Sequence, residues 1–117
     1  MKHILSEIRS GVGFITLNRH EALNALSLEM VSELSRLLSI WKANASIQAV
    51  AIRGSTKKGP FGNFCAGGDI QDLYHTGIKK NYSFGKKFWK DEYRLNKKIK
   101  NYPKPFISFI KGFAMGG

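Results

Sequence analysis

The chain has 117 residues, of which 43% are hydrophobic and 12% aromatic, a length and composition that suit one small domain and argue against disorder. Nineteen Lys and Arg against eight Asp and Glu give a net charge of +11. No apolar run approaches the roughly 18 residues of a membrane helix, and the start lacks the pattern of a secretory signal. A single cysteine, Cys65, excludes an internal disulfide framework and a cysteine-only zinc site.

The first third of the chain predicts a β-hairpin followed by a helix. Residues 3–9 and 13–18 alternate weakly and are rich in β-forming residues, as in two paired strands. Ser27 is a suitable N-cap for a helix. Apolar residues then recur at helical spacing over 31–41, which predicts an amphipathic helix that ends near Asn44.

The rest of the chain predicts two further strands and a long helix. Residues 48–53 form a short apolar strand pattern, and the order strand, helix, strand predicts a right-handed crossover between parallel strands. A long helix is predicted over 82–101, where Pro103 follows its end. Residues 106–110 then predict a buried strand. The fold class is therefore α/β.

The positive charge is concentrated in one segment. Residues 79–111 hold eleven Lys and Arg with two acids, whereas residues 1–78 hold eight with six acids. Aromatic residues lie between these lysines, a pattern found on nucleic-acid-binding surfaces. The simpler interpretation is a solvated helix face, and a third is a basic rim for a small molecule that carries phosphates. The sequence leaves all three open.

One acid of the long predicted helix falls on its apolar side. At about 100° per residue, Glu92 lies about 40° from Phe88 and about 20° from Ile99. Residues three and four positions away offer it no cation. A carboxyl group in that setting must be paired, protonated or placed in a cleft. Glu92 is thus either an acid satisfied by backbone amides or a distant Arg, or a lining residue of a binding pocket. Asp91, one position earlier, is expected to be solvated.

Two glycine pairs each follow a predicted strand. Residues 66–69 are Ala-Gly-Gly-Asp, and residues 116–117 are Gly-Gly. Glycine lets the backbone approach a ligand closely, and free amides at the start of a helix bind an anion or a developing oxyanion. Two such amides aimed at one carbonyl oxygen would form an oxyanion hole. A tight turn is the simpler interpretation of either pair taken alone.

Three segments in order resemble the crotonase (enoyl-CoA hydratase/isomerase) superfamily. They are residues 17–26 (LNRHEALNAL), 64–70 (FCAGGDI) and 111–117 (KGFAMGG). Within the superfamily, residues 64–70 and 88–96 (FWKDEYRLN) are most similar to the 3-hydroxyisobutyryl-CoA hydrolase branch. The resemblance implies a crotonase-like fold of ββα spiral repeats, truncated after the second glycine turn. Residues 1–117 would be the N-terminal part of a crotonase-like acyl-CoA-binding domain.

The same resemblance implies roles for individual residues. The amides of Gly68 and Gly117 match the catalytic pair that holds the thioester oxygen, and Glu92 matches a substrate-contacting glutamate of the hydrolase branch. Ala66 matches the residue whose carbonyl meets the adenine ring, and His20 stands where the family commonly has proline. The other implied substrate-binding residues are Asp69, Ile70, Glu21, Ala22 and Leu23. No residue is expected to bind a metal.

The activity implied by the resemblance is thioester hydrolysis in valine catabolism. The oxyanion hole would polarise the C=O, and a carboxylate would activate water or form an acyl intermediate. The alternatives are an enoyl-CoA hydratase/isomerase and, from another class, an RNA-binding relative. The family's late catalytic Glu and Asp match nothing in residues 1–117, so we expect these residues alone to be inactive.

The expected partner is an acyl-CoA substrate, of which coenzyme A is a part, so no separate cofactor is expected. We expect no membrane partner and disfavour nucleic acid. Self-association or a homo-oligomer is expected, because the open edge of a parallel sheet invites pairing. The expected location is the cytoplasm, or the mitochondrial matrix if the source is eukaryotic and a transit peptide has been removed.

Overall fold

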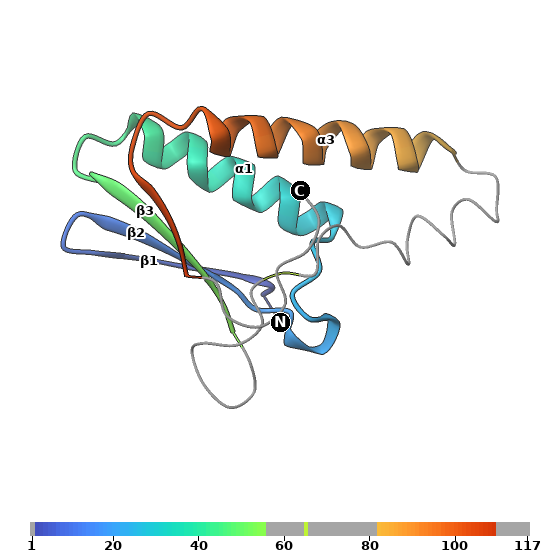
Figure 1. Ribbon diagram of the computed structural model, residues 1–117, viewed down its shortest axis with the longest axis horizontal. Helices are drawn as coiled ribbons and strands as arrows, with labels where there is room; N and C mark the ends of the chain where they lie inside the picture. The colour runs from blue at the N-terminus through green and yellow to red at the C-terminus, as the bar shows by residue number, and fades with distance from the viewer. Residues whose placement is uncertain (1, 56–64, 66–81, 110–117) are drawn as a thin grey trace.

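The computed structural model describes residues 2–55, 65 and 82–109, and these form a sheet with two helices on one of its faces (Figure 1). The strands are β1 (Ile4–Arg9), β2 (Val12–Leu17), β3 (Ala49–Gly54) and β4 (Phe106–Phe109). The helices are α1 (Leu28–Ala43) and α3 (Tyr82–Lys100), and a short 3-10 helix, η1 (His20–Ala22), lies between β2 and α1.

The sheet combines one antiparallel pair with three parallel strands. Its order is β1-β2-β3-β4. β1 runs antiparallel to β2, with Ile4 opposite Leu17, while β2, β3 and β4 are mutually parallel, with Val50 opposite Phe106. The predicted hairpin and the predicted parallel crossover are both confirmed. Because β2, β3 and β4 point the same way, their carboxyl ends lie at one edge of the sheet.

Helix α1 begins and ends where the sequence predicts. The Ser27 hydroxyl accepts a hydrogen bond from the Met30 amide at 3.2 Å, and Asn44 is the C-cap. This cap satisfies one of the amides that the first turn of a helix leaves unpaired. The apolar side of α1 covers the sheet and contributes most of the core, through Met30, Val31, Leu34, Leu37, Leu38 and Trp41.

Trp41 fits against β2 because β2 has no side chain at Gly13. A Cβ atom at Gly13 would lie 2.4 Å from Cε3 and Cζ3 of the Trp41 ring. Gly13 pairs with Val50 in the sheet, and Val50 is fully buried. The largest side chain of α1 therefore packs directly on the backbone of a central strand.

Helix α3 agrees with its prediction to within one residue, and its apolar stripe packs against the core. Phe88 and Leu95 are each 1% exposed, and Ile99 is partly buried against the same core. α3 lies beside α1 and runs in the same direction (Figure 1). Neither helix of the described chain has the length and apolar character needed to cross a bilayer.

Strand β4 is not the buried strand that the sequence predicted. Its first residue, Phe106, packs against the core, but Ile107 and Phe109 are about half exposed. The side chains of a strand alternate between the two faces of the sheet, so Ile107 and Phe109 point to the face that α1 and α3 do not cover. The prediction was wrong because an apolar run does not say how many faces of its strand are covered.

Lys104 closes the carboxyl end of α1. Its Nζ donates to the carbonyl oxygens of Trp41 and Asn44, the second at 2.7 Å. The Tyr102 hydroxyl donates to the Leu38 carbonyl at 2.8 Å. The last carbonyls of a helix lack hydrogen-bond partners within the helix, and a cation there also interacts favourably with the negative end of the helix dipole. Lys104 is therefore a structural residue rather than part of a solvated face.

We predict that Gly13→Ala lowers the free energy of unfolding by about 1–3 kcal/mol, because the added methyl overlaps the Trp41 ring. Urea denaturation measures this loss. In a Trp41→Leu background the same substitution should lower the free energy of unfolding by clearly less. An equal cost in both backgrounds would show that the indole is not the obstacle.

We also predict that Lys104→Met lowers the free energy of unfolding by about 1–2 kcal/mol, because two carbonyls of α1 lose a charged donor. Lys100→Met is the matched control, since Lys100 is an exposed lysine at the last position of α3. The control should change stability by less than about 0.5 kcal/mol. Equal losses in the two variants, measured by urea denaturation, would contradict the capping role.

Candidate functional site

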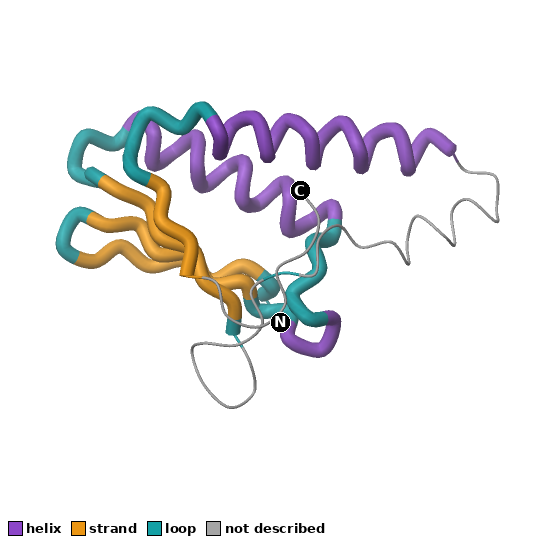
Figure 2. Tube along the Cα trace, in the orientation of Figure 1, coloured by secondary structure: helices purple, strands orange, loops and turns teal. Residues whose placement is uncertain are grey.

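Each of the predicted site segments follows one of the parallel strands in the sequence. Residues 21–23 follow β2, residues 66–70 follow β3, and Gly117 follows β4. The loop after β2 lies at the carboxyl edge, and the turn before β3 lies at the opposite edge (Figure 2). Ligands of open parallel sheets bind at the carboxyl edge. The residues predicted here that lie outside the described part of the chain are Ala66, Gly68, Asp69, Ile70 and Gly117.

Asn24 fixes the loop between β2 and α1. It is 0% exposed and has a φ of 58°. Its Oδ1 accepts from the Arg19 amide at 2.8 Å, and its Nδ2 donates to the Ser55 carbonyl at 3.3 Å. Asn adopts the left-handed conformation more readily than most residues, because its short polar side chain can bond locally. Asn24 therefore ties the loop to the end of β3.

A second set of contacts reinforces this connection. The Ser55 hydroxyl lies 3.0 Å from both the Leu17 carbonyl and Oδ1 of Asn18, and the Arg19 guanidinium donates to the Ala25 carbonyl at 3.1 Å. None of these positioning residues was predicted from the sequence. The available signal was the pair of asparagines in residues 17–26, a residue type that favours turns.

The loop presents Glu21 and Leu23 outward. Glu21 and Ala22 belong to η1, and Leu23 follows it with a φ of 53° and a largely exposed side chain. Oε1 of Glu21 lies 3.6 Å from Nε2 of His3. A hydrogen bond from its own backbone amide, helped by nearby positive groups, lowers the pKa of Glu21 below 4.5. Within the described chain, Nδ1 of His20 is buried without a hydrogen-bond partner. The loop thus exposes an apolar side chain and a carboxylate, while the imidazole nitrogen of His20 stays buried.

Glu92 is buried on the core side of α3, as its helical position predicts. It is 7% exposed, and its Oε2 has no hydrogen-bond partner among the residues described. Burial raises the pKa of Glu92 above 4.5. The group borders a hollow of about 720 Å³, whose other lining residues are Trp89, Lys90, Tyr93, Arg94, Asn96 and Lys97. Of the two predicted alternatives, an acid at the margin of a hollow fits better than a fully satisfied one.

Asp91 differs from its prediction. Its Oδ2 lies 2.9 Å from Nζ of Lys87, and its side chain is only 21% exposed. Asp91 lies at the margin of the packed face, where a lysine one turn earlier on the same helix can reach it. The two adjacent acids therefore have different surroundings, since Asp91 is paired and Glu92 is not. In the parts of the chain described, no hydrogen bond or ion pair joins Glu92 to the loop of residues 18–25.

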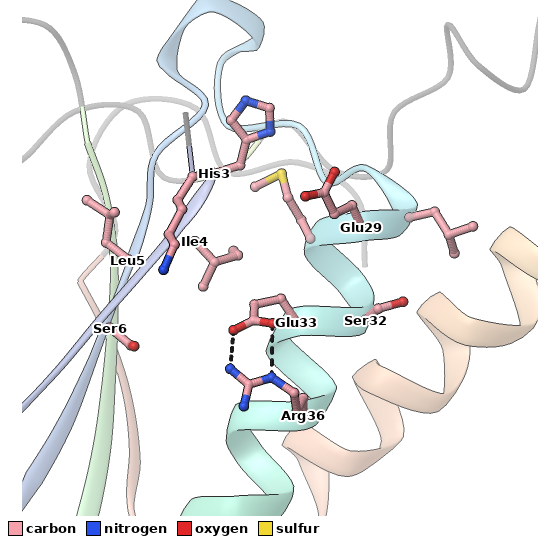
Figure 3. A pocket seen from close by; sticks show the side chains of 11 residues that line it. His3, Ile4, Leu5, Ser6, Glu29, Ser32, Glu33 and Arg36 are labelled. Atoms are coloured by element: carbon pink, nitrogen blue, oxygen red, sulfur yellow. Dashed lines mark hydrogen bonds and ion pairs between the residues drawn. The ribbon is translucent and has the colours of Figure 1, made fainter.

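The lining of a larger hollow includes no predicted site residue of the described chain, although His3 in that lining lies 3.6 Å from Glu21. The hollow has a volume of about 950 Å³ and separates the start of β1 from the first turns of α1 (Figure 3). Its lining includes Lys2, His3 and Glu29, and in the close-up Glu33 and Arg36 pair with each other along α1. The mixed charges of this lining favour no single class of ligand.

Known proteins are similar in sequence to almost the whole of this chain. The sequence pattern of the enoyl-CoA hydratase/isomerase family matches residues 12–117. The chain is 39% identical over 114 residues to a mitochondrial 3-hydroxyisobutyryl-CoA hydrolase of Danio rerio, covering 97% of this chain and 28% of the relative. It is 34% identical over 113 residues to a probable 3-hydroxyisobutyryl-CoA hydrolase of Arabidopsis thaliana, with 97% and 29% covered.

Solved structures show the same fold. An enoyl-CoA hydratase from Rhodobacter sphaeroides superposes with a TM-score of 0.86 at 39% identity, over 96% of this chain and 32% of that one. A carnitinyl-CoA dehydratase from Mycobacterium thermoresistibile superposes with a TM-score of 0.87 at 38% identity, with the same shares covered. The chain thus spans less than a third of the length of these relatives. The predicted crotonase-like α/β fold is confirmed, and the chain belongs to the enoyl-CoA hydratase/isomerase family.

Proposed function

We propose that this chain is part of an acyl-CoA thioester hydrolase that acts on 3-hydroxyisobutyryl-CoA. The observation that carries the proposal is Glu92, a buried carboxyl group with an unpaired Oε2 beside a hollow. It lies in residues 88–96, the segment that resembles the hydrolase branch. The names of the relatives in Danio rerio and Arabidopsis thaliana support the same activity.

In this proposal Glu92 binds the acyl group of the substrate. A buried carboxyl group with a raised pKa can donate a hydrogen bond when protonated and accept one when ionised. Either form can bind the hydroxyl group of a 3-hydroxyacyl chain. The free Oε2 then gains the partner that it lacks in the protein alone, so substrate binding offsets part of the cost of burying the acid.

The thioester would be activated by backbone amides rather than by Glu92. In the proposal, the amides of Gly68 and Gly117 donate to the thioester oxygen, where negative charge develops during attack by water. Glu21, Ala22 and Leu23 line coenzyme A, and the Ala66 carbonyl meets its adenine ring. The carboxylate that activates water matches no residue in 1–117, so Glu92 is assigned to binding alone.

Enoyl-CoA hydration is the second candidate. The hydratase from Rhodobacter sphaeroides is as similar in sequence as the hydrolase from Danio rerio, at 39% identity each. Both reactions use an oxyanion hole for the thioester oxygen, but hydration adds water to a C=C bond and leaves the thioester intact. The relative in Danio rerio is named as mitochondrial, which favours the mitochondrial matrix as the proposed location.

We predict that Glu92→Gln stabilises the chain at neutral pH by roughly 0.5–2 kcal/mol, as expected when a group retained for function is removed. The raised pKa means that the folded state holds the Glu92 proton more tightly than the unfolded state does. Its contribution to stability is therefore present in full below pH 4.5 and is lost as the pH rises through the folded-state pKa.

Urea denaturation at a series of pH values between roughly 4 and 8 tests this prediction. The advantage of Glu92→Gln over the natural chain should grow as the pH rises. Asp91→Asn is the matched control: it removes the acid that is paired with Lys87, so it should show no such gain. A constant difference between Glu92→Gln and the natural chain at every pH would contradict the assigned ionisation.

For activity, we predict that Glu92→Gln in the full-length protein lowers kcat/KM for 3-hydroxyisobutyryl-CoA by about 10- to 100-fold, the value of one hydrogen bond to a charged or acidic group. Asp91→Asn should change it by less than about threefold. Release of free coenzyme A, followed with a thiol reagent, measures turnover. Hydration of crotonyl-CoA without thioester cleavage would instead place the protein with the hydratases.

A further inference from the structure

The outward side of α3 carries positive charge and no exposed acid. Phe88 and Leu95 mark the side that faces the core. At about 100° per residue, five exposed cations lie on the opposite side, within a sector of about 120°. Asp91 pairs with Lys87, and Glu92 is buried. We call this surface the basic face of α3, and its cations are Lys86, Lys90, Arg94, Lys97 and Lys100.

The basic face is not required by the fold. Lys98 and Lys104 lie in the same stretch of sequence, but they donate to α1, Lys98 to the Ser39 hydroxyl at 2.7 Å. Within residues 82–109, no side chain of the basic face forms a hydrogen bond or ion pair with α1. Like charges one turn apart, such as Lys86 and Lys90, destabilise a helix. This arrangement costs folding stability, and a partner of opposite charge would offset that cost.

Two exposed aromatic side chains lie at the margin of the basic face and within it. Trp89 is 59% exposed and lies at the margin, and Tyr93 is 72% exposed and lies between the lysines, one helical turn away. Trp89 and Phe88 form a perpendicular ring pair, with the ring centres 6.1 Å apart. Trp and Tyr beside lysines are typical of surfaces at the interface between water and lipid, where an apolar ring and a polar tip are both accommodated.

We propose that the basic face of α3 docks on the surface of an anionic phospholipid bilayer. α3 forms an outer layer of the molecule (Figure 1), and its 19 residues extend over about 27 Å, so the helix can lie flat on a surface. Lipid phosphates would meet the cations, and Trp89 and Tyr93 would enter the headgroup layer. This contact goes beyond the proposed enzymatic function and departs from the expectation, drawn from the sequence, of no membrane partner. It needs no membrane-spanning helix.

The charges disfavour the other occupants of this surface. A second copy would bring an identical positive face to a chain that already carries +11, and the two would repel. Four of the five cations are lysines, which act as flexible point charges, whereas specific phosphate sites favour the fixed fork of arginine. A diffuse layer of headgroups matches flexible charges better than the fixed phosphate spacing of a nucleic acid does.

Vesicle sedimentation of the full-length protein tests the proposal. We expect binding to phosphatidylcholine vesicles that contain phosphatidylglycerol, loss of that binding at high salt, and no binding to phosphatidylcholine alone. Each cation removed should weaken binding by about fivefold. The triple variant Lys86→Gln, Lys90→Gln and Lys97→Gln should therefore bind on the order of 100-fold more weakly.

A matched triple variant controls for net charge. Lys2→Gln, Arg9→Gln and Arg36→Gln remove the same charge from exposed residues outside α3, and binding should stay within about threefold of the unmodified protein. Lipids brominated near the headgroup should quench the fluorescence of Trp89 but not that of Trp41, which is 3% exposed. Trp89→Phe should abolish the quenching.

Three results would overturn the proposal. They are equal binding to neutral and anionic vesicles, equal loss in the two triple variants, and quenching that persists in Trp89→Phe. Binding of a single-stranded oligonucleotide through Lys86, Lys90 and Lys97, with no binding to either kind of vesicle, would assign the basic face to nucleic acid instead. Trp89, Lys90 and Lys97 also line the hollow beside Glu92, so the thioesterase assay is run on the unmodified protein without vesicles. The two proposals then fail separately.

Discussion

The packing of Trp41 on Gly13 is the contact on which the described structure depends. It sets the distance between α1 and the sheet, because the indole ring occupies the place of a side chain on β2. The Trp41 carbonyl also accepts a hydrogen bond from Lys104, two residues before β4. One residue thus connects the helix layer, the central strands and the entry to the last described strand. A small residue opposite a large one is the usual way in which a core reaches close packing without strain.

From that packing follows the alignment that positions the site. With α1 seated on the sheet, β2 and β3 run parallel and end at the same edge, where Asn24 and Ser55 join the loop of residues 18–25 to the end of β3. The backbone there is held by side-chain hydrogen bonds rather than by regular secondary structure. A loop fixed in this way can present Leu23 and Glu21 to a ligand at a small cost in conformational entropy.

Much of the architecture followed from local patterns in the sequence. Ser27 and the apolar repeat over residues 31–41 predicted α1, and the long repeat around Phe88 and Leu95 predicted α3. The position of Glu92 on the apolar side of its helix was also correct. Other predictions failed where the outcome depended on neighbouring elements. Asp91 found a partner in Lys87, and β4 proved exposed on one face. The roles of Gly68 and Gly117 remain predictions.

By itself, the sequence determined where helices and strands form and which side of each is apolar, since spacing along one element decides both. It also determined the family, through segments 17–26, 64–70 and 111–117. Only the tertiary structure decided that Lys98 and Lys104 support α1 while Lys90 and Lys97 stay exposed, and that Asn24 bonds to Ser55. These contacts join residues far apart in the chain, 31 positions for Asn24 and 60 for Lys104 with Asn44. Local spacing carries no information about such pairs, because they form only once packing has brought the elements together.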